Sequence, residues 1–215
     1  MNKRGTGRGQ GLLELAVILP VLLILLMGLV EIGYGLRDYL IVVNACREGC
    51  RFAARGRFAP DDVGQRVVIA GGIVRQGNPP ADVPFLRTRG TLDPNTGIVV
   101  TIIPMDGAGD VDPLAVTTYY SGVVPSQAGG VRPILSADSA ISMTQIVQRH
   151  GPATQQINDA REAAGYERMD NRIVVVEVFF MHHPLWNAPF VPLPDPWMMR
   201  AQTEMRVVTD RGTLQ

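Results

Sequence analysis

The chain has 215 residues, with 20 Lys and Arg against 20 Asp and Glu, so its formal net charge at pH 7 is zero. This balance excludes a nucleic-acid binder that relies on bulk electrostatics, because such a protein needs a basic excess to release counterions from phosphates. The only two cysteines, Cys46 and Cys50, exclude both a disulfide framework and a four-cysteine zinc module. The length allows one membrane segment and one domain of ordinary size.

A candidate membrane segment follows a short basic stretch. Residues 1–9 contain three basic residues and no acid, and residues 15–30 are uncharged and mostly Leu, Ile or Val. Extending this run to residues 12–36 supplies the roughly 20 apolar residues that a bilayer span requires. The extension admits Glu14 and Glu31, which a span tolerates if each lies near an interface or is paired.

Three interpretations of this segment compete. A cleaved secretory signal has a basic start, but its apolar core is shorter and ends in a small-x-small site, which is missing where the run meets Glu31. A buried core helix is disfavoured by the high hydrophobicity, so a retained N-terminal anchor fits best. Basic residues flank both ends and do not settle the orientation, although the purely basic N-terminal flank favours a cytoplasmic N-terminus.

The helix is predicted to continue beyond the membrane. Residues 36–54 carry apolar side chains at spacings of three and four, which predicts a stripe that packs on a soluble domain. Pro20 should kink the helix and Gly56 should end it, so we predict one helix over residues 11–56, about 70 Å long. The predicted stripe consists of Leu36, Tyr39, Leu40, Val43, Cys46, Cys50, Ala53 and Ala54.

These N-terminal residues resemble a known family. A basic leader ends at Gly9, Gln10 follows it, and Glu14 stands fifth after the leader, which is the layout of a type IV prepilin peptidase site. The continuation is similar to the TadE/TadG-like pseudopilins, which are pilin-like components of the tight-adherence (Tad) pilus and secretion machinery. The stretches that carry the resemblance are residues 11–20, 28–33 and 44–54, together with the closing stretch 198–206.

The resemblance implies cleavage after Gly9, which would make Gln10 the first residue of the mature chain. A carboxylate one turn inside an apolar helix is costly unless a cation meets it, and the new α-amino group of Gln10 on a neighbouring subunit is a suitable partner. We therefore expect Glu14 to set the subunit register. The alternative is that Glu14 lies at headgroup level at little cost, and for Glu31 this alternative is favoured.

Beyond the helix, the sequence predicts an α+β head whose antiparallel sheet packs on the helix stripe. Runs of β-branched residues indicate the strands, and Gly and Pro mark the loops. The predicted helices cover residues 61–77, 136–150 and 152–165, the strands 98–103, 115–120, 173–181 and 200–209, and the loops 105–113, 122–133 and 184–196. In the strongest strand, Val174, Val176, Val178 and Phe180 alternate with Ile173, Val175, Glu177 and Phe179.

No residue pattern predicts catalysis, a cofactor or a resident metal. His182 and His183 are adjacent and point to opposite faces if they continue a strand, so they are interpreted as ordinary residues before Pro184. Cys46 and Cys50 are interpreted as buried small residues, with a bond to another subunit as the alternative. A calcium site remains open for three acids in a Gly-rich loop, although their spacing lacks the order of a calcium-binding loop; these are Asp106, Asp110 and Asp112.

The predicted organisation is a leader over residues 1–9, a transmembrane helix over 10–36, a helix extension over 37–57 and an extracytoplasmic head over 58–215. The predicted function is that of a membrane-anchored pseudopilin or minor pilin of a Tad-like pilus or secretion apparatus. Its partners would be a prepilin peptidase, other pilin-like subunits, Tad-type secretion components and membrane lipid, with no nucleic acid. The alternative is an uncleaved single-pass envelope protein whose head is a binding module or hydrolase.

Overall fold

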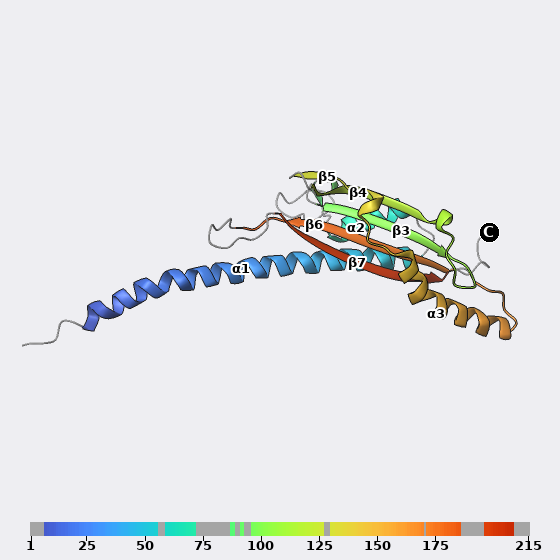
Figure 1. Cartoon of the computed structure of the whole chain (residues 1–215), viewed down its shortest axis with the longest axis horizontal. Coiled ribbons are helices and arrows are strands. Elements are labelled where there is room, and N and C mark those ends of the chain that lie inside the picture. The colour runs from blue at the N-terminus through green and yellow to red at the C-terminus, as the bar shows by residue number, and fades with distance from the viewer. Residues whose placement is uncertain are drawn as a thin grey trace, which may run out of the picture.

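The protein consists of one long helix and an α+β head that packs on its C-terminal half (Figure 1). The computed structural model describes residues 7–55, 59–71, 87–88, 91–92, 96–126, 130–169, 171–185 and 196–208. The helices are α1 (Gly7–Ala54), α2 (Pro60–Gly71) and α3 (Met143–Ala163), with short 3-10 turns at Pro113–Ala115 and Ser136–Asp138. The strands are β1 (Arg87–Thr88), β2 (Thr91–Leu92), β3 (Thr96–Met105), β4 (Thr117–Pro125), β5 (Val131–Pro133), β6 (Asn171–His182) and β7 (Trp197–Val208).

The helix α1 extends far beyond the head. Its 48 residues correspond to about 72 Å at the standard helical rise. The helix runs through Pro20 without a break and bends gently in Figure 1, as expected where proline removes one backbone hydrogen bond. The predicted single helix over residues 11–56 is therefore confirmed, apart from its ends.

The head is built on a five-stranded antiparallel sheet with the order β5-β4-β3-β6-β7. The two longest strands, β6 and β7, pair over twelve residues each, from Asn171↔Val208 to His182↔Trp197. Pairing of β3 with β4 ends at Ile102, whereas pairing with β6 continues to Met105. The chain therefore tolerates Pro104 within β3, because at this position one side of the strand is an open edge. Strands β1 and β2 form a separate two-stranded pair.

Each face of the sheet buries alternate residues of its central strands. On the face covered by α1 and α2, β3 contributes Ile98, Val100 and Ile102 to one hydrophobic cluster. The opposite face buries Ile103 and Val99 in two further clusters. The predicted alternation of β6 is confirmed, since Val174, Val176, Val178 and Phe180 join the first cluster, while Ile173, Val175 and Phe179 join the other two.

The predicted apolar stripe of α1 is wrong in its N-terminal half. Leu36, Tyr39 and Leu40 are 57%, 44% and 52% exposed, and Ala54 is exposed as well. The helix instead meets the sheet and α2 through mostly small residues, because these let the backbones approach closely. A Cβ atom on Gly49, for example, would lie 2.4 Å from a methyl group of Val67 in α2. The buried residues of this face are Gly35, Val42, Ala45, Cys46, Gly49, Cys50 and Ala53.

Two predicted boundaries in the head are also wrong. Pro152 does not start a new helix but lies inside α3, and the two halves of α3 run in different directions in Figure 1. Proline disfavours the helical conformation of the residue before it through clashes with that residue's N–H and Cβ, and Gly151 has no Cβ. The predicted loop 122–133 contains the end of β4 and all of β5, which pair from Val123↔Pro133 to Pro125↔Val131.

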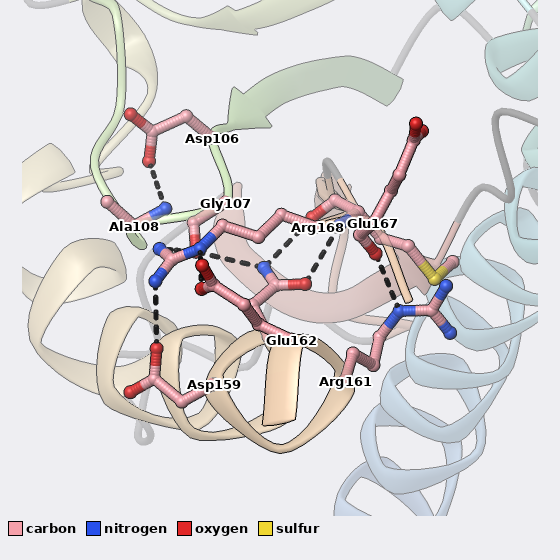
Figure 2. A network of polar contacts seen from close by, with 10 residues as sticks. Asp106, Gly107, Ala108, Asp159, Arg161, Glu162, Glu167 and Arg168 are labelled. Atoms are coloured by element: carbon pink, nitrogen blue, oxygen red, sulfur yellow. Dashed lines mark hydrogen bonds and ion pairs between the residues drawn. The ribbon is translucent and has the colours of Figure 1, made fainter. Parts of the chain in front are cut away.

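The turn after β3 is held against the C-terminal half of α3 (Figure 2). The buried Asn158 side chain donates to the carbonyl oxygens of Gly107 and Met169 at 2.9 and 3.0 Å, and accepts from the Met169 N–H at 2.8 Å. Arg168 adds exposed ion pairs to two carboxylates of α3. The amide is therefore fully used in joining the turn, the helix and the start of β6.

Replacing Gly109 by alanine is expected to lower the free energy of unfolding by about 3 kcal/mol. Gly109 has a φ of +90°, and an added Cβ would lie 2.6 Å from the Gly151 carbonyl oxygen on α3. The matched control is Gly165→Ala, since Gly165 has a φ of +81° but an added Cβ would meet no atom within 4 Å. Thermal unfolding followed by circular dichroism measures both variants in micelles. An equal loss of stability in the two variants would show that the turn does not approach α3 closely.

Candidate membrane-anchoring and assembly helix

The predicted cleavage and register residues lie at the N-terminal end of α1. Gly9 and Gln10 belong to its first turns, and Glu14 lies about one turn beyond Gln10 along the helix. Glu14 is exposed, and no described residue forms a hydrogen bond or ion pair with it. Among the described residues, therefore, no group compensates this carboxylate.

The apolar part of α1 is not covered by the head. Every residue from Gly11 to Leu29 is exposed, including Leu12, Leu13 and Leu25 at about 70%. Gly11, Gly28 and Gly33 would each meet no atom within 4 Å if they carried a Cβ. By length and composition α1 is a candidate membrane span, the only one among the described residues. Such a contiguous apolar surface requires lipid or other helices around it.

The head forms polar contacts with α1 at the point where the apolar run of the helix ends. His182, the last residue of β6, places Nδ1 2.7 Å from a carboxylate oxygen of Asp38 and Nε2 3.1 Å from one of Glu31. The second oxygen of Glu31 accepts from the Leu185 N–H at 3.0 Å. All three side chains are largely buried, with 6%, 11% and 14% of the His182, Glu31 and Asp38 side chains exposed. A neutral imidazole can donate to only one carboxylate, whereas an imidazolium donates to both.

This junction was not predicted from the sequence. The sequence pattern favours Glu31 as a residue at headgroup level and His182 as an ordinary residue before Pro184. The structure brings them together across 151 positions, and Asp38 and His182 across 144. No local pattern can signal such a pairing. The sequence does contain two unusual features at these positions, namely acidic residues in an otherwise apolar helix and a polar residue at the end of an apolar strand, but neither identifies the other as its partner.

The two cysteines belong to the face of α1 that packs on β6 and β7, as predicted for buried small residues. Cys46 donates to the Ala201 carbonyl oxygen at 3.5 Å, and Cys50 donates to that of Thr203 at 3.3 Å. Both are free and fully buried. Burial raises the pKa of Cys50 to about 12 and also raises the pKa of Cys46. These thiols therefore serve packing, and the alternative bond to another subunit would require the head to leave the helix.

Both thiols are expected to resist a thiol reagent at neutral pH in the folded chain and to react in denaturant. Because their pKa values are raised on folding, the stabilisation is complete below the unfolded pKa of 9.0 and is lost as pH rises toward about 12. Each thiol should lower the free energy of unfolding by up to about 1.4 kcal/mol per pH unit in that window. Colorimetric thiol titration and denaturant unfolding at several pH values measure these effects. Rapid labelling of the folded chain would contradict this packing.

The acidic loop residues are used within their own turns. Asp106 accepts from the backbone N–H groups of Ala108 and Asp110, both at 2.9 Å. Asp112 accepts from the Leu114 N–H at 2.9 Å and caps a short 3-10 helix. The described residues contain no group of three His, Cys, Asp or Glu side chains that could hold a metal ion. The open possibility of calcium at Asp106, Asp110 and Asp112 therefore gains no support from the geometry.

Comparison with known families identifies the N-terminal part of the chain. Residues 9–51 match the family described as TadE-like protein, so the resemblance to TadE/TadG-like pseudopilins is confirmed over this range. The match covers most of α1 and stops before the head. No curated protein and no solved structure matches the chain. The match supports a role related to the Tad pilus and to membrane anchoring.

Proposed function

We propose that this protein is a pseudopilin or minor pilin of a Tad-like pilus or secretion apparatus, matured by a prepilin peptidase that cleaves after Gly9. The apolar helix would anchor the chain in the cytoplasmic membrane, with the N-terminus in the cytoplasm and the head outside. Its partners would be the peptidase, other pilin-like subunits and Tad-type secretion components. In an assembly that reaches the surface, the head would contribute to adherence.

One observation carries this proposal beyond simple anchoring. The TadE-like match begins at Gly9, next to an apolar helix whose first two turns contain a single carboxylate, which has no partner among the described residues. A freestanding anchor has no need for Glu14 at that position, and leucine would insert at lower cost. In an assembly, the α-amino group created at Gln10 would supply a cation one turn away from Glu14 of a neighbouring subunit. The charge then selects register between subunits, which is the best-attested use of a buried polar pair.

Replacing Glu14 by leucine or glutamine is expected to leave insertion and head folding intact but to weaken incorporation into the assembly. Leaving the Gln10 amine unpaired in a low-dielectric bundle costs about 3 to 5 kcal/mol, which corresponds to at least about 100-fold weaker association. The measurement is co-purification of the variant with its assembly partners from cells. Leu13→Ala is the matched control, because Leu13 is the adjacent residue and is 71% exposed.

Two outcomes discriminate between the interpretations. If Glu14 lies at headgroup level, an exposed pair contributes only about 0 to 1 kcal/mol, and Glu14→Leu should be recovered like the wild type. Such recovery would reject the register role. The mass of each variant is measured in the same experiment, because loss of cleavage would indicate that Glu14 is needed for recognition by the peptidase instead.

A further inference from the structure

The end of the head at which β6 finishes and β7 begins is fixed against one level of α1. His182 and Trp197 face each other in the register of the two strands, and their rings meet edge-on at 6.5 Å between centroids. His182 in turn contacts Glu31 and Asp38 on the helix. A Cβ atom on Gly35 would lie 3.8 Å from the Trp197 ring, so the indole packs directly on the helix. Trp197 therefore lies at the level of residues 31–38.

Exposed apolar and aromatic side chains occur on both α1 and the head at this level. Trp197 and Met198 are each 47% exposed, although they begin a strand of the head, and Leu185 is 50% exposed. The helix adds Ile32 at 70% and Tyr34 at 43%. We call this group of five the collar. It is continuous with the exposed apolar surface of α1, and no described part of the head covers it.

The length of the apolar helix places the collar relative to a bilayer. Residues 12–30 span about 28 Å at the helical rise, which is close to the roughly 30 Å thickness of the hydrocarbon core. Glu31 is then the first charged residue beyond the core, and it is paired with His182 and the Leu185 N–H rather than left alone. Trp and Tyr side chains favour the layer between hydrocarbon and water, since one end of each ring system is apolar and the other is polar.

We propose that the β6–β7 end of the head docks on the membrane surface, with the collar in the interfacial layer and Trp197 as its main anchor. This inference rests on the proposed membrane anchoring of α1. In this arrangement the membrane-spanning part of α1 ends near Val30 rather than at Leu36. The head then lies directly on the membrane surface and is not held away from it. The contacts of His182 with Glu31 and Asp38 fix the depth at which the indole lies.

The test is depth-dependent quenching of tryptophan fluorescence in the full-length protein. The sequence has a second tryptophan, Trp186, which is replaced by phenylalanine so that Trp197 is the only emitter. The protein is reconstituted in vesicles of phosphatidylcholine brominated near the carbonyl end of its acyl chains. Trp197 emission should fall to about half of its value in unbrominated lipid, because the indole lies within contact distance of the bromine layer. Lipid brominated near the chain ends should quench it less.

The matched control moves the emitter to the opposite end of the head. In a Trp186→Phe, Trp197→Phe and Leu114→Trp variant, the indole replaces a side chain that is 96% exposed beyond the far end of β3. That end lies about 36 Å from the collar along twelve strand residues, so its emission should not change in brominated lipid. Quenching of this variant to the same extent as Trp197 would show that the whole head lies on the membrane, and would overturn the docking by one end.

Flotation of the same vesicles separates failure of this proposal from failure of membrane anchoring. If the protein floats with the vesicles but Trp197 is not quenched, the docking is wrong and the anchor stands. If Trp197 emission instead changes with the protein-to-lipid ratio and not with bromination, a second copy of the chain covers the collar, which also overturns the proposal. If the protein does not float, the anchoring itself is wrong.

Discussion

Replacing Arg200 by leucine is expected to lower the free energy of unfolding of the head by about 3 kcal/mol, because it leaves a buried carboxylate without its cation. Glu177 on β6 has no exposed surface. Its carboxylate accepts from the Arg200 guanidinium on β7, from the Ser139 hydroxyl and from the Ala140 N–H. The arginine also lies over the Phe179 ring, 5.4 Å from its centroid, and is 31% exposed. The partial exposure keeps the expected loss near the lower end for a broken buried pair.

Two further variants make this expectation decisive. The double variant Arg200→Leu, Glu177→Leu should recover most of the lost stability, since a buried ion pair can often be replaced by apolar residues without loss. Arg168→Leu, which removes exposed ion pairs to Asp159 and Glu162, should cost much less. Thermal unfolding of the full chain in micelles ranks the three. A double variant as unstable as Arg200→Leu would show that packing of the arginine, rather than pairing of the charge, holds this part of the sheet.

Replacing Gly9 by alanine is expected to leave the protein in the membrane as an uncleaved precursor, with the processed fraction falling from nearly all of the chain to nearly none. The reason is that a peptidase acting at the membrane face needs the close backbone approach that glycine permits. The measurement is the molecular mass of the variant isolated from cells that contain the peptidase.

The matched control for this variant is Gly11→Ala. A Cβ atom at Gly11 would meet no atom within 4 Å, so the substitution adds the same methyl group two residues further along the same helix. Gly11→Ala should be processed normally. Normal processing of Gly9→Ala would reject the cleavage site, and failure of both variants would show that the helix start, rather than the leader residue, controls processing.

The fold was predictable where the signal is local. The period-2 alternation places the apolar residues 173–176 and 178–180 on the correct faces of β6, because successive side chains of a strand point to opposite faces of the sheet. The apolar run of α1 likewise predicts a helix from its own composition. The alternation also predicts which face of the sheet Glu177 belongs to. The arginine that compensates its charge, however, comes from the neighbouring strand, 23 positions later. Its identity depends on the strand register and not on the local pattern.

The errors have physical reasons of the same kind. Counting large apolar residues misplaced the buried face of α1, because this helix packs through Gly35, Ala45 and Gly49, which contribute little hydrophobicity. The Gly and Pro content of residues 122–133 predicts a loop, but β5 lies in this segment. It pairs at the edge of the sheet, where proline is tolerated. The junction of Glu31 and Asp38 with His182 depends on tertiary structure alone. The prediction of Gly9, Gln10 and Glu14 came from resemblance, since a processing site is specified by the enzyme that reads it.

The intact mass of the wild-type protein tests the central claim most directly. The protein is purified from membranes of cells that contain the prepilin peptidase and, in parallel, from cells that lack it. A mature Tad-like pseudopilin should begin at Gln10 in the first preparation and retain the basic leader in the second. A chain that still carries residues 1–9 when the peptidase is present would contradict the claim, and would indicate a permanent single-pass anchor with an extracytoplasmic head.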